Sequence, residues 1–143
     1  MTRTALTATA ARAVIIGTCQ LAANRPVTSA IICDRRLTAQ HSLSVMLRPL
    51  RSLIEITCVG DGFELVDAYS ARPVDIVLIG IERSCNAGPE AIGLQLAMHP
   101  RSVIITVGAV ADVDLLVAAT VRGSRGLLVW DPDQPPPDGP LVW

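Results

Sequence analysis

The stretch VDIVLIGIERSCNAG, residues 74–88, decides the fold. Its first eight residues form a nearly continuous apolar run, which is typical of a central parallel strand covered on both faces. The run passes Gly80 and enters a polar loop that ends at Gly88. Ligands bind at this end of the strands in an open parallel α/β sheet. The sequence therefore predicts a strand that reaches a functional position with no side chain there.

Apolar runs and helix-like segments alternate on both sides of this strand. The predicted strands are SAIICD (29–34), IEITCVG (54–60), VDIVLIGI (74–81), RSVIITVG (101–108) and RGLLVW (125–130). Segments with helical spacing or helix-ending prolines lie between them, at 37–50, 61–73, 88–100 and 112–123. Strands that alternate with helices indicate right-handed crossovers and a parallel sheet, so we expect an α/β, three-layer sandwich with helices on both faces.

The two ends of the chain differ from this central part. Residues 1–27 are rich in Thr and Ala, and we interpret them as an N-terminal extension that forms a helix. Residues 28–131 form the predicted domain, and 132–143 a Pro-rich tail or linker, since proline excludes a helix there. The last covering helix is then missing. Either the chain is cut from a longer protein, or a neighbouring molecule or the N-terminal helix covers that side.

Composition limits the classes of function. With 143 residues, half of them hydrophobic, the chain is long enough for one substantial core. A formal net charge of −1 gives no broad attraction to nucleic acid or anionic lipid. All twelve cationic residues are Arg, so chemistry that needs a Lys amine is excluded. Four cysteines without CxxC spacing, and no apolar run long enough to span a bilayer, favour a cytoplasmic protein without a membrane partner.

Residues 29–132 resemble the receiver domain of two-component response regulators, particularly those of LuxR-type transcription regulators. The matching stretches are IICDRRLTAQHSLSVML, VDIVLIGIERSCNAGPEAI, HPRSVIITVGA and VRGSRGLLVWDP. The last contains a Gly-x-x-Gly-apolar turn and strand ending in Asp131. The resemblance implies a flavodoxin-like sheet of strand order 2-1-3-4-5. It also implies a C-terminal helix-turn-helix, DNA-binding domain outside this chain.

The resemblance further implies where a phosphorylation site would lie. Such receivers carry an Asp at the end of the third strand, two acids after the first that help it hold Mg²⁺, a Thr or Ser after the fourth, and a Lys after the fifth. Here these positions fall on Gly80, on Cys33 and Asp34, on Val107, and on Trp130. Asp34 alone fits. We therefore expect a degenerate pocket without metal, cofactor or catalytic residues, in a protein that is not an enzyme.

The residues themselves argue against phosphorylation. An aspartyl phosphate needs a carboxylate nucleophile, and Gly80 has no side chain, while Glu82 would have to bend back into the pocket. A single carboxylate beside a thiol is also a poor site for Mg²⁺. Loss of clustered carboxylates predicts a fold that does not need Mg²⁺. We expect the indole of Trp130 to fill the space beside Gly80.

Several functions stay open for such a domain. The pocket can be packed shut in a module that forms a homodimer or docks to another domain, with 112–123 and the fifth strand as the interface. It can instead bind a small-molecule ligand. A redox pair of Cys33 and Cys85 is a third hypothesis. A nucleotide- or flavin-dependent enzyme is the alternative from another class, although GDGFE (60–64) lacks the spacing of a phosphate-binding loop.

Overall fold

The structure is a computed structural model that describes residues 3–8, 14–19, 28–48, 55–129 and 141–142. Five of its strands form a central parallel sheet: β3 (Ser29–Cys33), β4 (Glu55–Val59), β5 (Ile76–Gly80), β6 (Ile104–Gly108) and β7 (Gly126–Val129). They lie in the order β4-β3-β5-β6-β7. Counted along the chain from β3, this is the predicted order 2-1-3-4-5, and all four pairings are parallel.

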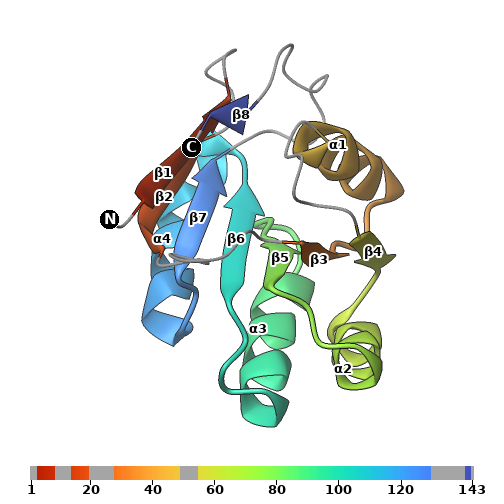
Figure 1. The fold of residues 1–143 in the computed structure, drawn as a ribbon. Coiled ribbons are helices and arrows are strands. Elements are labelled where there is room, and N and C mark those ends of the chain that lie inside the picture. Colours follow the sequence, from red (N-terminus) through yellow and green to blue (C-terminus); the bar gives the residue numbers. More distant parts are fainter. Residues whose placement is uncertain (1–2, 9–13, 20–27, 49–54, 130–140, 143) are drawn as a thin grey trace.

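Helices cover both faces of this sheet (Figure 1). They are α1 (Leu37–Leu47), α2 (Gly62–Ala71), α3 (Ala87–Met98) and α4 (Val113–Arg122), the last preceded by a 3₁₀ turn, η1 (Val110–Asp112). Leu43 and Met46 of α1 pack with Leu78 of β5 on one face. Helices α2, α3 and α4 pack on the other face, where Ile79 belongs to the core. The three-layer α/β prediction is therefore confirmed.

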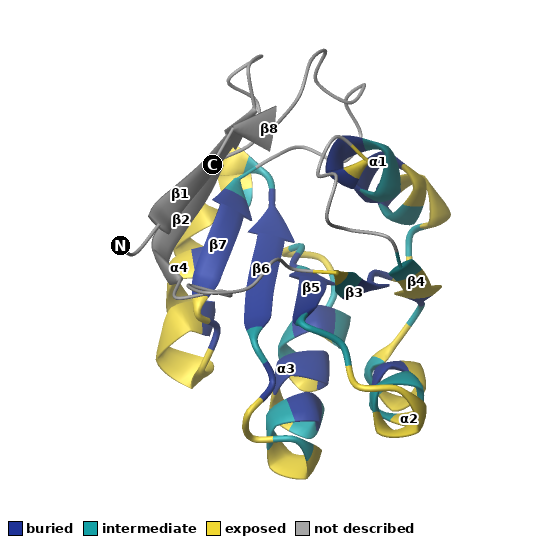
Figure 2. Cartoon of the chain, viewed as in Figure 1, coloured by how far each residue is buried: buried dark blue, intermediate teal, exposed yellow. Residues whose placement is uncertain are grey.

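The core is built mainly from aliphatic residues, since the chain has only one Phe, one Tyr and two Trp. Strands β5 and β6 are buried along nearly their whole length (Figure 2). Their side chains alternate between the two faces, so that β5 contributes Leu78 to the α1 side and Ile79 to the other. Burial of one such side chain stabilises the fold by about 1.5–3 kcal/mol. A continuous apolar run in the sequence is thus the mark of the two strands at the centre.

The prediction of a helix near the N-terminus is wrong. Two strands, β1 (Arg3–Ala8) and β2 (Val14–Cys19), lie there and pair with each other in antiparallel fashion. Strand β2 also pairs with β7, and β1 with the short C-terminal strand β8 (Leu141–Val142), so the whole sheet has eight strands. The open edge of β7 offers unpaired backbone groups, and the β-branched residues of β2 suit a strand. Tertiary pairing therefore overrides the helical pattern.

This extension changes the expected interface. Because β2 pairs with β7, the edge of the fifth parallel strand is covered by the same chain. Among the described residues after β7, the only regular element is β8, so the described part of the chain has no helix in that position. The domain boundaries at 27, 131 and 132 stay predictions. The exposed face of α4 is the part of the proposed interface that remains.

Candidate functional site

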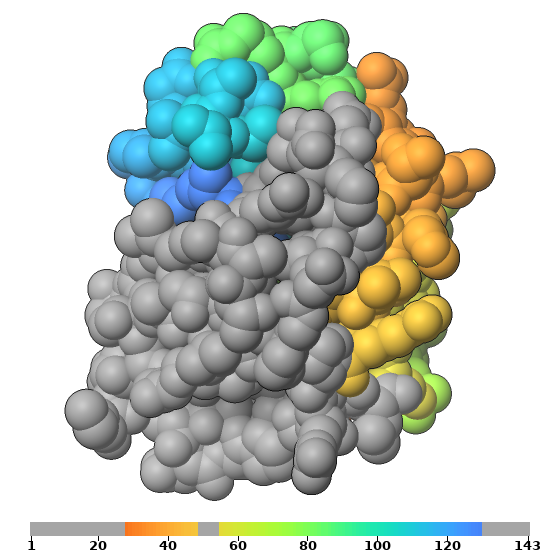
Figure 3. Space-filling model, turned by 90° about the horizontal axis from the view of Figure 1, so that it is seen from above, coloured from red at the N-terminus to blue at the C-terminus, as the bar shows by residue number. Residues whose placement is uncertain are grey.

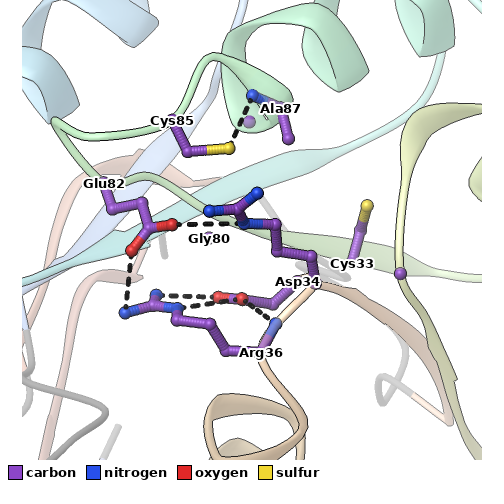
Figure 4. Close-up of a pocket in the computed structure, with 10 residues that line it drawn as sticks. Cys33, Asp34, Arg36, Gly80, Glu82, Cys85 and Ala87 are labelled. Carbon is purple, nitrogen blue, oxygen red and sulfur yellow. Dashed lines mark hydrogen bonds and ion pairs between the residues drawn. The ribbon is translucent and has the colours of Figure 1, made fainter.

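A small pocket lies where the carboxyl ends of β3 and β5 meet. Seen from above, the segment after β3 (orange) and the loop after β5 (green) lie next to each other (Figure 3), and ion pairs join them. The cavity has a volume of about 10 Å³, which is room for about one water molecule. Asp34, Arg36, Gly80 and Glu82 are among the residues that line it (Figure 4). The pocket is therefore filled mainly by its own side chains.

The carboxylate of Asp34 occupies the space that a side chain at Gly80 would need. A methyl group added to Gly80 would collide with Oδ2 of Asp34 and lie 2.7 Å from its Cγ, whereas real Cβ contacts essentially never fall below 3.0 Å. The Asp34 side chain is only 5% exposed. The expectation that Trp130 fills this space concerns a residue outside the described ranges. Among described residues, Asp34 fills it.

Arg36 fixes the position of this carboxylate. Oδ1 of Asp34 accepts hydrogen bonds from the backbone N–H of Arg36 at 2.9 Å and from its Nε at 3.1 Å. Oδ2 accepts one from Nη2 of the same side chain at 2.9 Å. A fork of this kind binds a carboxylate more strongly and more specifically than a single contact. Arg36 therefore holds Asp34 with three hydrogen bonds, two from its guanidinium group and one from its backbone N–H.

Glu82 completes a network of two carboxylates and two guanidinium groups. Its Oε2 lies 3.4 Å from Nη1 of Arg36, and its Oε1 lies 3.5 Å from Nε of Arg35. Figure 4 shows the Glu82 carboxylate turned toward Arg36. The Glu82 side chain thus bends back to the pocket, which is the condition that the sequence sets for a role of Glu82 there. Its carboxylate forms ion pairs with both Arg35 and Arg36, and the Arg36 guanidinium is also bound to Asp34.

Local backbone geometry brings these groups together. Arg36 is the extended N-cap residue of α1, so its side chain lies beside the residues that end β3. Nε2 of Gln40 donates to the carbonyl oxygens of Asp34 at 2.7 Å and of Val59 at 3.2 Å, which ties α1 to the ends of β3 and β4. A tight turn after β5, closed by a bond from the Cys85 N–H to the Glu82 carbonyl at 3.3 Å, positions Glu82.

The same loop is anchored to α4 through the next residue. Nη2 of Arg83 donates to Oδ1 of Asp114 at 2.5 Å and to the carbonyl of Ala111 at 3.3 Å, and its Nε lies 3.5 Å from Asp112. The hydrogen bond from Arg83 lowers the pKa of Asp114, and the same bond raises the pKa of Arg83. Glu82 and Arg83 thus hold the loop to α1 on one side and to α4 on the other.

The structure separates the remaining predicted site residues. Val107 is adjacent to Gly80 in the β5–β6 register, and its carbonyl accepts the N–H of Ile81 at 2.8 Å, but its side chain belongs to the core on the α1 face. Thr106, the residue before it, points to the opposite face, with its Oγ1 3.4 Å from Oγ of Ser124. Neither Val107 nor Thr106 therefore places a hydroxyl group at the pocket. Trp130 lies outside the described residues.

The two residues predicted for the acid pair, Cys33 and Asp34, lie in different surroundings. Cys33 is the last residue of β3, it is buried, and its side chain packs in the core with Ile31 and Val59. Asp34, directly after the strand, lines the pocket, and so does the next residue, the cationic Arg35. Sequence reasoning did not assign a role to either arginine. The doublet Arg35–Arg36 directly after Asp34 is the signal that could have identified them.

The two cysteines do not form a disulfide, and one is unsuited to redox chemistry. Cys33 and Cys85 are both free thiols. Burial raises the pKa of Cys33 to about 12, and the nearby carboxylates of Asp34, Asp61 and Glu64 add to the effect. A reactive cysteine needs a lowered pKa. Figure 4 shows the sulfur of Cys85 directed at the N–H of Ala87, 3.3 Å away.

The pocket residues do not fit Mg²⁺. This ion requires near-octahedral oxygen ligation, and usually one or two free carboxylates. Here Asp34 is bound by Arg36, and Glu82 is paired with Arg35 and Arg36. The described residues contain no group of three or more His, Cys, Asp or Glu that could hold a metal ion. A cation in this pocket would have to displace a guanidinium from each acid.

Comparisons with known proteins give a consistent result for the fold. No family model matches the sequence, and no curated protein matches it significantly. Many solved structures do match. A receiver domain of a response regulator from Bacteroides fragilis has a TM-score of 0.64 at 18% identity, over 74% of this chain and 88% of that one. The chain has the fold of response-regulator receiver domains.

Two further structures illustrate the range of this fold. A complex of CheX and CheY with BeF₃ and Mg²⁺ from Borrelia burgdorferi matches with a TM-score of 0.56 at 17% identity, over 75% of this chain and 80% of that one. NtrX from Brucella abortus, in complex with ADP, matches with a TM-score of 0.60 at 15% identity, over 68% of this chain but only 22% of that one. The same fold therefore occurs as one part of a much longer protein.

None of the described helices is both long enough and apolar enough to cross a membrane.

Proposed function

We propose that this chain is a phosphorylation-independent receiver-like domain of a cytoplasmic transcription regulator, without catalytic activity of its own, that acts by dimerisation or by docking to a partner domain. The carboxylate of Asp34 in the space of a residue-80 side chain is the observation that carries the proposal. The pocket thus has no acceptor at Gly80, and its remaining acid is bound by Arg36. Phosphoryl transfer to an aspartate at this position has no nucleophile.

Intact-mass measurement tests the first part of the proposal. The protein is incubated with acetyl phosphate and millimolar Mg²⁺, beside a receiver domain that retains its acceptor aspartate. We expect the mass of this protein to stay unchanged while the control gains a phosphoryl group. A stoichiometric gain that is lost with hydroxylamine, as expected for an acyl phosphate, would contradict phosphorylation independence.

An apolar stripe on α4 supports the docking part. Val113, Val117 and Val121 follow one another at four-residue spacing and are 41%, 54% and 88% exposed. Residues four apart lie on the same side of a helix, so the three side chains form one stripe. Figure 2 shows α4 as a largely exposed helix. Asp112 precedes the stripe and Arg122 follows it, so two copies of α4 packed antiparallel would place unlike charges opposite each other.

The oligomeric state tests this surface. Sedimentation velocity over a hundredfold concentration range should show a reversible dimer for the wild type and a monomer for Val117→Lys. Ala118→Lys, at an exposed position on the same helix about 100° around the axis from Val117, is the matched control and should dimerise normally. A wild type that stays monomeric at the highest concentration leaves docking to another domain as the proposed mode. A Val117→Lys variant that dimerises like the wild type would contradict the use of this stripe.

A groove between α2 and α3 favours small-molecule binding as a second candidate. It has a volume of about 280 Å³, and its lining includes the apolar residues Phe63, Ala91 and Leu94 and the acidic residues Asp61 and Glu90. This chemistry suits a small amphipathic cation. A thermal-shift screen of such compounds should show hits that are lost in Phe63→Ser, a change that costs little stability because Phe63 is 76% exposed. A flavin or nucleotide that co-purifies with the protein would favour the enzyme alternative instead.

A further inference from the structure

The groove between α2 and α3 is built from the first turn of α2 and the first half of α3, which lie side by side (Figure 1). Gly62 lets the two helices approach closely, because a Cβ added there would lie 3.0 Å from Cα of Ala91 and 3.5 Å from Cδ2 of Leu94. The volume of about 280 Å³ is near the lower limit for drug-sized ligands, whose sites hold roughly 300–1,000 Å³. The groove therefore has room for a group of about the size of one long side chain.

Two carboxylates at this groove have no counter-charge within the described part of the chain. Asp61 accepts the N–H of Glu64 through Oδ1 at 2.9 Å, and it forms no ion pair with a described residue. Glu90 has no side-chain hydrogen bond and no ion pair with another described residue. The ion pairs between described residues use other acids, namely Asp34, Glu55, Glu82, Asp112 and Asp114. The groove therefore presents negative charge that a partner can neutralise.

An exposed aromatic ring lines the same groove. Phe63 is 76% exposed, whereas Ala91 is buried and Leu94 is half-buried. A cation is attracted to the face of such a ring, and a planar guanidinium group also stacks on it. The guanidinium group binds carboxylates through paired hydrogen bonds, and the aliphatic stem of arginine packs on apolar surface. Acids, ring and apolar floor together match an arginine side chain more fully than a compact ammonium ion.

The exposure of Phe63 also indicates what carries the arginine. Sites for free small ligands enclose roughly 70–90% of the ligand surface. Here the ring faces water over most of its surface, so a small ligand held against it would be left open on that side. A second protein surface can cover both, and arginine and aromatic side chains supply much of the binding energy at protein–protein interfaces. A partner domain therefore fits this groove better than a free metabolite.

We infer that the α2–α3 groove is the docking site for an arginine side chain of a partner protein domain. The guanidinium group of this arginine binds Asp61 and Glu90 and lies against the ring of Phe63. The inference rests on the docking part of the proposed function and deepens it, because it names the chemistry of the partner surface. The stripe on α4 is apolar, so the two surfaces recognise different partners.

Titration of the ¹⁵N-labelled protein with a defined peptide tests the inference. The probe is the acetylated and amidated peptide Ala-Leu-Arg-Leu-Ala, and the comparison probe has citrulline in place of arginine, which keeps the shape and removes the charge. We expect the arginine peptide to shift the backbone amide signals of Phe63, Ala87, Ala91 and Leu94, with saturation at millimolar concentration. The citrulline peptide should leave these signals unchanged at the same concentration.

Variants of the groove separate specific binding from general charge attraction. Glu90→Gln and Phe63→Ser should each weaken binding of the arginine peptide by about threefold or more. Asp67→Asn is the matched control, because it removes an exposed carboxylate from α2 at a position that does not line the groove. It should leave the Kd unchanged. The three positions are exposed, and the spectrum of each free variant shows that it is folded.

The inference is overturned by an arginine peptide that shifts no groove signal, or by a citrulline peptide that binds equally well. An Asp67→Asn variant that loses as much affinity as Glu90→Gln also overturns it, since binding would then follow net charge. Butylguanidine carries the same cation on a free alkyl chain, and we expect it to bind more weakly than the peptide. Butylguanidine that binds as tightly as the peptide would overturn partner docking and favour the small-molecule candidate.

These readouts are independent of the phosphorylation test. A protein that gains no phosphoryl group and does not bind the arginine peptide keeps the phosphorylation-independent function and loses this docking site. A protein that gains a phosphoryl group contradicts the proposed function, whatever peptide it binds.

Discussion

Replacement of Gly80 by alanine should destabilise the protein although the backbone there does not require glycine. Among the described glycines, only Gly123 has a positive φ, so the cost at Gly80 comes from contact alone. The new Cβ would lie 2.7 Å from Cγ of Asp34 and in collision with its Oδ2. Either the strand or the carboxylate must move.

The expected cost follows from what holds the carboxylate in place. Asp34 accepts three hydrogen bonds from Arg36 and is nearly buried, so it cannot move aside without loss of these bonds. Overpacking of a well-packed site costs about 1–3 kcal/mol, and a disturbed buried ion pair adds to it. We expect Gly80→Ala to lower the free energy of unfolding by about 3 kcal/mol.

A double-mutant cycle with Asp34→Ala isolates this contact. Without the Asp34 carboxylate, the closest remaining atom of residue 34 is its Cβ, 3.3 Å from the new methyl group. Gly80→Ala should then cost less than about 1 kcal/mol, so the coupling energy is about 2 kcal/mol or more. Gly93→Ala is the matched control: nothing lies within 4 Å of its new Cβ, and mid-helix alanine stabilises by about 0.5–1 kcal/mol relative to glycine.

Urea unfolding of these variants at neutral pH, followed by circular dichroism, gives all the required free energies. Additive effects of Gly80→Ala and Asp34→Ala would refute the packing argument, and so would a stable Gly80→Ala single variant. Gly80→Asp extends the test to function. It restores a carboxylate to the end of β5, yet we expect neither stability nor phosphorylation by acetyl phosphate, since the new side chain meets Asp34 and the chain has no lysine.

Three further predictions follow from single features. The pKa of Cys33 is raised to about 12 in the folded protein, compared with 9.0 in the unfolded chain. The contribution of Cys33 to the free energy of unfolding is therefore constant below pH 9 and falls above it by up to about 1.4 kcal/mol per pH unit. Urea unfolding at alkaline pH should show this slope for the wild type and Cys58→Ala but not for Cys33→Ala. Gly123 has φ 122° and its Cβ would lie 2.5 Å from Leu96, so Gly123→Ala should cost about 1–3 kcal/mol in the same assay. Val117→Lys should leave the Tm within about 1 °C of the wild type, because its site is half exposed, while it abolishes dimerisation.

The central fold was predictable because local signals and tertiary structure agree there. The apolar runs that form β5 and β6 are buried along their length, and Asp61, a residue type that favours this position, accepts the N–H of Glu64 at 2.9 Å as the N-cap of α2. At the N-terminus they disagree. The pairing partner of Val14–Cys19 is Gly126–Val129, more than a hundred residues away, and no local pattern encodes that partner. The Thr- and Ala-rich sequence there was interpreted as a helix, whereas the structure has two strands.

The sequence predicted that Gly80 brings no side chain to the pocket, but it did not predict which side chain occupies the space beside Gly80. Gly80 ends β5 and lines the pocket, so the position at which the resemblance places an acceptor has no side chain. The identity of the residue that fills the space depends on side-chain directions across two strands and a helix start. Asp34 was assigned to the pocket, but its clamp by Arg36 and the contact with Glu82 arise only in the folded chain.

The neighbouring residues Glu82 and Arg83 show why this pocket is suited to a constant state. A switch needs an element with two arrangements whose balance a ligand or modification changes. The loop after β5 is the natural candidate, since it connects the pocket to the start of α4. Here Glu82 is paired with arginines at the start of α1, and Arg83 is paired with Asp112 and Asp114 at the start of α4. Because every one of these partners belongs to the same chain, the proposed function predicts that the free energy that holds the loop does not vary with metal or phosphate. Under this proposal, regulation comes from what binds α4 or the α2–α3 groove.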